Sequence, residues 1–532
     1  MSSPVVMWQS IPNAVDVTPW PKNRGLFQLF YYFSILCVGE LLIGYDGTIT
    51  GSLQALPEWK ADLGNPDASK IGLLNAAAFI VGICMGPINS WVVDRFGRKL
   101  PIQWFSMTMI VGTIIGCIAG AKGGQTGYAL FVASRAVIGA GIPPFLMTAL
   151  ILNQELSHPR YRALCSALWD CDFILGSTIA SLVTFGTSHI TGSWSWRVPY
   201  ILQLLPATYM LVAVHFMPES PRWLVANGRE EEAFEFFVKY HGNGDPNDEL
   251  VAFEWQEVKE TIALEEANRR RSWAEVLRMP GNKHRLCLAA LMTFMPQMSG
   301  SNIISYYYSV VLTQSGISGA GKITGIGAGL NMWGFVCQVG GVWALHSCRR
   351  RTMVLSVWPL LMIGMAAMAA SNGVFQVSDQ SNHAAGVASV VMVWLYNGPA
   401  NFISPLFYSY PAEILSYSIR GKGMAVWNTV NQAWGAYGSY VNSIALANIG
   451  WKYYCVFIPI LAVQWVAAYF LMVETRLLTL EEIAIAFEGA DAAVAVVDER
   501  LRGSDDNKSQ LAADDEKKIV SEGSGNVVIS EV

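Results

Sequence analysis

Charged side chains are scarce in this chain. Asp, Glu, Lys and Arg make up 14% of its 532 residues, whereas a soluble domain carries about 25%. Hydrophobic residues make up 52%, and the mean hydropathy is +0.34. This balance excludes an ordinary soluble domain and indicates a membrane protein with several spanning helices. The net charge of −5 gives no reason to expect a nucleic-acid partner.

The sequence also lacks the residue clusters that catalysis and metal binding require. We find no nucleophile–base set, phosphate-binding loop or metal-ligand cluster. The nine cysteines form no C-x-x-C pair, which argues against a disulfide framework or a zinc site. They include Cys37, Cys84, Cys117 and Cys337, which lie inside apolar runs. We therefore expect no enzymatic activity, no cofactor and no metal.

Apolar runs of spanning length dominate the rest of the chain, each close to the ~20 residues that a bilayer requires. Residues 1–24 are polar, so we expect the first run to act as the targeting signal without cleavage. The pattern predicts an all-α membrane protein with twelve transmembrane helices. The runs lie at 27–48, 71–93, 101–120, 127–152, 163–186, 197–217, 286–313, 322–346, 353–371, 384–409, 423–447 and 451–473.

A charged segment divides the runs into two sets of six. It contains Val251, Trp255, Val258 and Ile262 at helical spacing, which predicts amphipathic helices. The tail beyond about 489 is polar and aperiodic, and we expect it to be disordered. The predicted parts are an N-terminal tail (1–26), a six-helix bundle (27–217), a helical linker (218–285), a second bundle (286–473) and a C-terminal segment (474–532).

Basic residues cluster in alternate loops, which predicts that these loops lie in the cytosol. Both termini and the linker then lie on the cytosolic side as well. The clusters are Arg95, Arg98 and Lys99; Arg160 and Arg162; Arg269–Arg271; Arg349–Arg351; and Arg420 and Lys422.

The two sets of helices repeat one another. Glu155 and Arg162 recur 258 residues further on as Glu413 and Arg420, and Glu219 recurs 255 residues further on as Glu474. Two related six-helix bundles with a substrate site between them, near the membrane midplane, would explain this repeat.

Two charges lie inside apolar runs, Asp46 in the first and Arg135 in the fourth. A charge in hydrocarbon is costly and usually marks a substrate or proton path. If the two side chains meet, they neutralise one another until a proton intervenes. The alternative is a permanent structural ion pair.

Taken together, the motifs resemble those of the sugar porter family of the major facilitator superfamily over residues 27–487. Residues 410–424 and 450–454 further resemble the fungal lactose-permease-like branch, which implies a di- or oligosaccharide substrate. The motifs are Gly44-Tyr45-Asp46, Asp94–Lys99, Arg135-x3-Gly139-x-Gly141, Glu155 with Arg162, Pro218–Leu224, Gln297–Gly300 with Asn302, and Glu474-Thr475 before Thr479–Glu482.

The resemblance implies roles for charged residues. Proton symporters of the family carry an Asp at the position of Asp46, paired with the Arg of the fourth span, whereas passive facilitators carry an amide. Charges at the cytosolic helix ends would form latches that pair in one conformation and separate in the other; solvated loop charges are the alternative. The latch residues would be Asp94, Arg95, Arg98, Glu155, Arg162, Glu219 and Arg222 in the first half, and Glu413, Arg420 and Glu474 in the second.

The resemblance also implies sugar-binding side chains, because hydroxyl groups need donors and acceptors. We expect a helix break at Gly300 to bring Gln297 and Asn302 together. Asn331 and Asn431 could equally be polar contacts between helices, as could Asp172, which faces away from Asp170. The predicted substrate contacts are Asp170, Gln297, Asn302, Asn331, Tyr408 and Asn431.

The chain departs from the family pattern at two notable places. Pro296 stands where the family commonly has a further Gln, so one sugar contact is missing. Residues 346–351 lack the acid, the first basic residue and the glycine of the corresponding first-half loop, which predicts a weaker latch in the second half.

These observations predict a monomeric proton-coupled sugar symporter of the plasma membrane, with a sugar, a proton and the lipid bilayer as partners. Its substrate would be a di- or oligosaccharide or a hexose. The alternatives are a non-transporting sugar sensor and a carrier for a non-sugar metabolite.

Overall fold

The computed structural model describes residues 23–269, 273–278, 280–378, 381–415, 419–476 and 487. Within these ranges every regular element is a helix. Most of the predicted N-terminal tail, and the segment beyond 489, lie outside the described residues.

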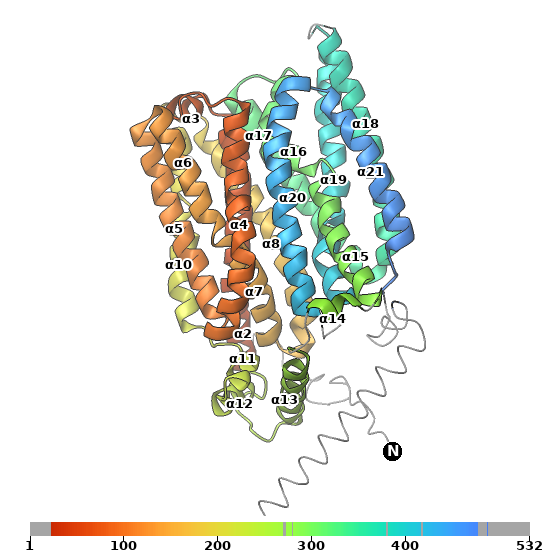
Figure 1. The fold of residues 1–532 in the computed structure, drawn as a ribbon. Helices are drawn as coiled ribbons and strands as arrows, with labels where there is room; N and C mark the ends of the chain where they lie inside the picture. The colour runs from red at the N-terminus through yellow and green to blue at the C-terminus, as the bar shows by residue number, and fades with distance from the viewer. Residues whose placement is uncertain are drawn as a thin grey trace, which may run out of the picture.

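Six spanning segments make up the first half of the chain (Figure 1). The fourth is interrupted at Ala140–Gly141, just before Pro143 and Pro144, since proline cannot continue the hydrogen-bond ladder. The elements are α2 (Arg24–Leu53), α3 (Pro57–Asp62, a short helix between spans), α4 (Ala68–Phe96), α5 (Lys99–Lys122), α6 (Gly124–Gly139), α7 (Ile142–Leu156), α8 (Pro159–Thr187), α9 (Trp194–Ile201), α10 (Leu204–Ala213) and η2 (Val214–Phe216).

The second half repeats this arrangement. Each of the twelve predicted apolar runs falls on one helix or on consecutive helical segments. Seven segments of the described chain are, by length and composition alone, apolar enough to cross a membrane. The elements are α15 (Pro280–Gln297), α16 (Ser301–Gln314), α17 (Ala320–Ser347), α18 (Arg350–Val377), α19 (His383–Ile414), α20 (Arg420–Ile449) and α21 (Lys452–Leu471).

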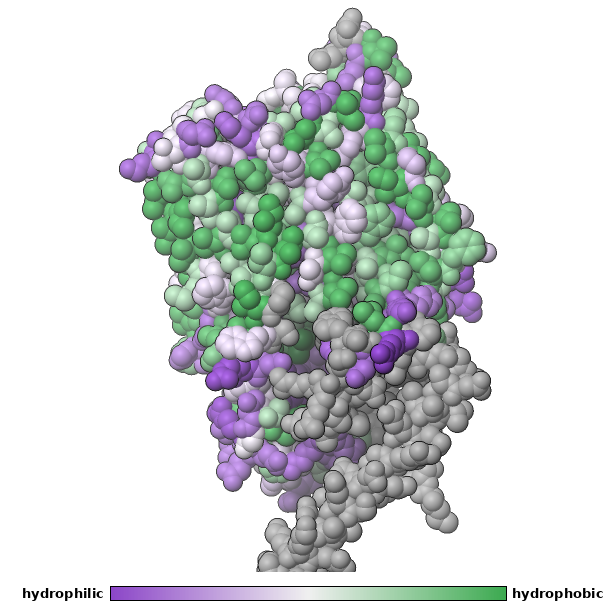
Figure 2. Space-filling view, in the orientation of Figure 1, coloured by the Kyte–Doolittle hydropathy of each residue, from purple (hydrophilic) through white to green (hydrophobic). Residues whose placement is uncertain are grey.

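Apolar side chains cover the outer face of the helices as well as their core. Figure 2 shows a hydrophobic band with hydrophilic residues gathered above and below it. Leu205, Val463 and Phe470 are exposed by 68%, 66% and 76%. Such a surface would aggregate in water, and it suits a lipid environment.

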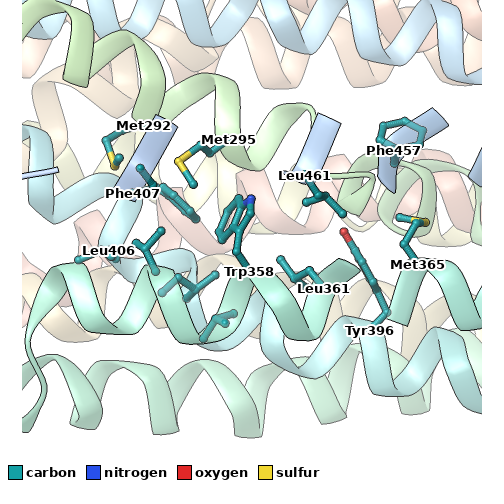
Figure 3. Packing of buried hydrophobic residues seen from close by; sticks show 14 of the residues in the cluster. Met292, Met295, Trp358, Leu361, Met365, Tyr396, Leu406, Phe407, Phe457 and Leu461 are labelled. Atoms are coloured by element: carbon teal, nitrogen blue, oxygen red, sulfur yellow. The ribbon is translucent and has the colours of Figure 1, made fainter. Parts of the chain in front are cut away.

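Each half has its own buried core. In the second half, Trp358 packs edge-on against Phe407, with ring centroids 5.6 Å apart (Figure 3). Its Nε1 donates a hydrogen bond to Gln464 Oε1 at 3.1 Å. In the first half, the rings of Phe105 and Phe145 stack at 4.5 Å. The indole donor of Trp358 therefore has a partner, as a buried polar group requires.

The halves meet mainly along α4 with α20 and α8 with α17, and also where α16 approaches α2. We call the end of the molecule that carries α11–α13 the linker end, and the opposite end, where α3 lies, the far end (Figure 1). Hydrogen bonds join the halves toward the far end. Ser443 Oγ donates to Ala68 O at 2.7 Å, and Asn75 Nδ2 donates to the Tyr307 hydroxyl at 2.9 Å.

The described part of the linker contains α11 (Pro221–Ala226), α12 (Glu230–Tyr240), α13 (Glu249–Arg269) and α14 (Trp273–Arg278). The periodic apolar residues that predict a helix lie on α13. Val251 and Val258 of α13 are buried. The buried His241 ring contacts Glu254 Oε2 through Nδ1 at 2.5 Å and Leu156 O through Nε2 at 3.3 Å. These contacts tie the linker to the end of α7.

Candidate functional site

The structure brings Asp46 of α2 and Arg135 of α6 together inside the first half. Arg135 Nη1 lies 2.6 Å from Asp46 Oδ1 and 2.8 Å from Oδ2. The two side chains are exposed by only 1% and 5%. A pair so far removed from water is costly unless its charges remain matched, so removal or neutralisation of either partner should have a large effect.

Close helix packing places this ion pair. A Cβ atom on Gly44 would lie 1.8 Å from Phe173 O of α8, and one on Gly139 would lie 2.2 Å from Ala78 O of α4. Only glycine permits these approaches. Asp46 follows Gly44 by two residues, and Arg135 precedes Gly139 by four. The close approaches at these glycines therefore position both helices so that the two charged side chains can meet.

A second polar cluster, which we call the amide cluster, lies in the other half and consists of Gln297, Asn302 and Asn431. Asn302 Nδ2 donates to Gln297 Oε1 at 2.7 Å, and Gln297 Nε2 donates to Asn431 Oδ1 at 2.9 Å. Gly300, with a φ of +98°, separates α15 from α16. This left-handed conformation favours glycine, and the break folds Asn302 back onto Gln297.

One helix links the two clusters. Tyr306 lies four residues after Asn302 on α16 and therefore on the same face. It is close enough to Asp46 and Arg135 to interact with both electrostatically, and its carbonyl accepts a hydrogen bond from Gln54 Nε2 of α2 at 3.2 Å. Sequence reasoning missed Tyr306, although its spacing from Asn302 is a signal that could have found it.

The remaining predicted substrate residues are scattered. Asn331 donates to Ser181 Oγ at 2.7 Å and so bridges the halves, as polar side chains between membrane helices often do. Tyr408 is 41% exposed and packs against Trp427, with ring centroids 5.5 Å apart. Asp170 lies on α8, but its side chain falls outside what the structure describes. Its neighbour Asp172 contacts Cys37 of α2.

Predicted latch residues converge at the linker end of the first half. Glu219 accepts hydrogen bonds from the backbone N–H groups of Arg98 (2.9 Å) and Lys99 (3.3 Å) at the start of α5. Glu155 Oε2 lies 3.4 Å from Arg98 Nε and accepts a hydrogen bond from Ser220 Oγ at 2.5 Å. A carboxylate at a helix N-terminus is stabilised by the free N–H groups and the helix dipole.

The second half builds the same cluster from the predicted latch residues Glu413 and Glu474, together with Arg350 and Arg351, which the latch prediction did not include. Glu474 accepts from the N–H groups of Arg350 (3.0 Å) and Arg351 (3.2 Å). Arg350 Nη2 lies 3.1 Å from Glu413 Oε1, and Thr475 Oγ1 donates to Glu413 Oε2 at 2.5 Å. The altered loop at 346–351 was expected to weaken this latch. The contacts of this cluster are nevertheless present, because Arg350 supplies both the side chain and the backbone contact; the weaker latch stays a prediction. The offset of 252 residues between Arg98 and Arg350 could have identified Arg350.

The other latch residues lie around these clusters. Arg162 Nη2 lies 3.7 Å from Glu254 of α13, so this predicted latch residue contacts the linker. The carbonyl of Asp94 accepts a hydrogen bond from Trp223 Nε1, and the Arg95 guanidinium lies 5.9 Å from the Phe96 ring. Arg222 begins α11 with Pro221. Arg420 begins α20, but its side chain lies outside the described residues.

Comparison with known proteins settles the family. The profile described as "Sugar (and other) transporter" matches residues 33–487. The chain belongs to this family. It is therefore a membrane transporter and not an enzyme, as its sequence predicts.

Relatives with named activities cover most of the chain. It is 26% identical to the high-affinity glucose transporter of Kluyveromyces lactis, over 88% of this chain and 86% of that protein. It is 25% identical to the quinate permease of Neurospora terricola, over 88% of this chain and 90% of that protein. These relatives support the sugar porter prediction at family level; the di- or oligosaccharide branch stays a prediction.

Solved structures confirm the fold. The xylose transporter XylE of E. coli, in a partially occluded inward-open conformation, superposes with a TM-score of 0.69 at 15% sequence identity. The match covers 85% of this chain and 99% of XylE. The inward-open conformation of XylE gives a TM-score of 0.68 at 18% identity, over 86% of this chain and 99% of that one. The predicted major facilitator architecture of two six-helix bundles is thus correct.

Proposed function

We propose that this transporter is a proton-coupled symporter that imports a neutral sugar, a hexose or a di- or oligosaccharide, by alternating access. The observation that carries the proposal is the buried Asp46–Arg135 pair. A carboxylate buried inside a membrane domain usually marks a substrate or proton path. The related proton:xylose symporter XylE gives a precedent within the fold.

The substrate would bind at the amide cluster. Amides both donate and accept hydrogen bonds, as a sugar's hydroxyl groups require, and the half-buried Gln297, Asn302 and Asn431 present three of them together. With Pro296 in place of a further amide, the cluster would hold the sugar through fewer contacts. An acid such as quinate would meet no basic side chain among these three residues.

Coupling would run along α16. A sugar that binds Asn302 would shift α16, because Asn302 lies on that helix. The same helix carries Tyr306, which lies near the ion pair. Protonation of Asp46 removes the partner charge of Arg135 and weakens the pair. Each ligand would thereby alter the affinity for the other, as linkage requires.

We further propose that the linker end faces the cytosol at the plasma membrane, with both termini on that side and a monomer as the functional unit. The basic residues of the linker-end loops support this orientation. The functional parts would be bundles at 27–217 and 286–473 joined by the linker at 218–285.

Uptake by yeast cells that lack their own sugar carriers tests the proposal. Labelled glucose, lactose, cellobiose and quinate are supplied at acidic and neutral external pH. We expect at least one sugar to accumulate, and faster at acidic pH. Asp46→Asn should abolish accumulation but leave exchange of sugar across the membrane, because an amide cannot carry the proton.

Asp172→Asn is the matched control, since it neutralises another acid at the α2–α8 contact and should leave accumulation intact. If Asp46→Asn accumulates sugar at the wild-type level, the ion pair has a structural role and does not couple transport to the proton. Absence of any uptake by protein present at the plasma membrane would favour the sensor, and uptake of quinate alone would favour the non-sugar carrier.

A further inference from the structure

A groove of about 400 Å³ opens on the outer surface where the two halves meet, toward the far end. It runs between α4 and α20, which lie side by side at the front of Figure 1. Its lining comes from α4, α6 and α20 and consists of Ser69, Lys70, Leu73, Ala76, Ile80, Tyr128, Ala436 and Tyr440.

The wall of the groove is apolar and faces outward. Leu73 and Ile80, seven residues apart on one face of α4, are exposed by 41% and 47%. The groove therefore opens to hydrocarbon, and its occupant needs an aliphatic chain.

The upper rim of the groove is polar. The Lys70 ammonium lies 3.4 Å from Gln125 Oε1 and 5.8 Å from the centre of the Tyr128 ring, and neither group is charged. The hydroxyl of Tyr440 lies 3.3 Å from Ser69 Oγ. A cation and two hydroxyl groups at the head of an apolar channel complement a phosphate attached to an aliphatic chain.

The length of the groove matches one leaflet. Lys70 and Ile80 are ten residues apart, about 15 Å along a helix. Half of a ~30 Å hydrocarbon core is the same length. A lipid whose phosphate sits at Lys70 would thus lay one acyl chain along the whole groove.

We propose that this groove binds a glycerophospholipid of the far-end leaflet through its phosphate group. Its phosphate contacts the Lys70 ammonium and the Tyr440 hydroxyl, and one acyl chain packs against Leu73, Ile80 and Ala436. Because α4 and α20 belong to different halves, the lipid contacts both halves across their seam. This site is separate from the ion pair and the amide cluster.

Binding of fluorescent phosphatidylglycerol to the full-length protein in detergent tests the proposal. Unlabelled phosphatidylglycerol should displace the probe, and inorganic phosphate at the same concentration should not. Lys70→Gln should weaken binding about fivefold, since one basic residue contributes about 1 kcal/mol to anionic lipid binding. Ala436→Phe, which fills the groove without changing charge, should weaken it as well.

Lys122→Gln is the matched control, because Lys122 is an exposed lysine at the far end of α5, outside the groove. It should bind lipid as the wild type does. Equal binding by all three variants would mean that lipid binds the protein surface without using this groove. Displacement of the probe by inorganic phosphate would show that the acyl chain is not recognised. Each variant is compared only after its melting temperature without lipid matches the wild type. The assay involves neither sugar nor a proton gradient, so its outcome is independent of the transport proposal.

Discussion

The two halves of the molecule are most alike at the linker end and least alike at mid-membrane. At the linker end, Glu219 and Glu474 accept backbone hydrogen bonds of nearly equal length at the starts of α5 and α18. Even the next contact is repeated: Lys99 Nζ donates to His215 O, and Arg351 Nη2 donates to Tyr469 O. At mid-membrane, the first half holds a buried ion pair and the second half holds neutral amides.

This contrast distinguishes the linker-end clusters, which suit a conformational change, from the mid-membrane groups, which suit ligand binding. A repeated cluster suits a movement that both halves make in the same way, whereas a charge on one side and amides on the other suit two different ligands. The comparison also shows what the linker-end cluster needs. Gly97 at a φ of +91° is replaced by Arg349 at −74°, yet the carboxylate still meets the helix N-terminus. The carboxylate and the helix start, rather than the whole loop motif, define the cluster.

The largest expected effect tests whether the two linker-end clusters stabilise the protein equally, by neutralising Glu219 and Glu474 in separate variants. Glu219→Gln and Glu474→Gln should each destabilise the protein by about 1–3 kcal/mol, because backbone donors lose a charged acceptor. Thermal unfolding in detergent measures the effect. We expect similar falls in melting temperature; a fall for one variant alone would mean that the halves are alike in geometry but not in energetics.

A second change tests the chemical difference between the halves. Gln297→Ala should raise the KM for sugar about tenfold with little change in kcat, because the amide cluster loses a hydrogen-bonding group worth about 1.4 kcal/mol. Concentration-dependent uptake measures both constants. Asn331→Ala is the control, since Asn331 contacts Ser181 and should change KM less. An unchanged KM for sugar in Gln297→Ala would contradict the assignment of sugar binding to the amide cluster of the second half.

Much of this arrangement could be predicted from the sequence. Twelve apolar runs and the repeated acidic residues define the fold, because spanning length and periodicity are local properties. The pairing of Asp46 with Arg135 also follows from the high cost of isolated charges in hydrocarbon. The break at Gly300 could be anticipated because it sits between two amides that an unbroken helix would separate.

Contacts that depend on the packing of distant segments could not be predicted. Arg350 was overlooked because its loop lacks the recognisable motif, and the His241–Glu254 contact joins two linker helices whose approach no local pattern specifies. Asn331 illustrates the same limit: one sequence position fits a substrate contact or a contact between helices, and its contact with Ser181 is of the second kind.

The smallest expected effect concerns His158, which lies between α7 and α8, outside the membrane spans. Its Nδ1 accepts a hydrogen bond from the backbone N–H of Arg160 at 3.2 Å, capping α8. Burial, followed by the nearby His241, Arg162 and Arg160, lowers the pKa of His158 to about 3. The unfolded chain therefore binds the proton more readily than the folded one between that value and 6.5. The contribution to stability is complete above pH 6.5 and is lost as the pH falls below it.

At about pH 5.5 the loss should be roughly 1 kcal/mol. His158→Asn keeps the capping acceptor without a titrating ring, so its melting temperature should fall less than that of the wild type between about pH 7.5 and about pH 5.5. His189→Asn, in the exposed turn that follows α8, is the control and should behave as the wild type. In the second half, 258 residues further on, the sequence has Ser416, which carries no titrating ring. If His158→Asn and the wild type lose stability equally on acidification, the acid sensitivity arises elsewhere, and this difference between the halves has no consequence for stability.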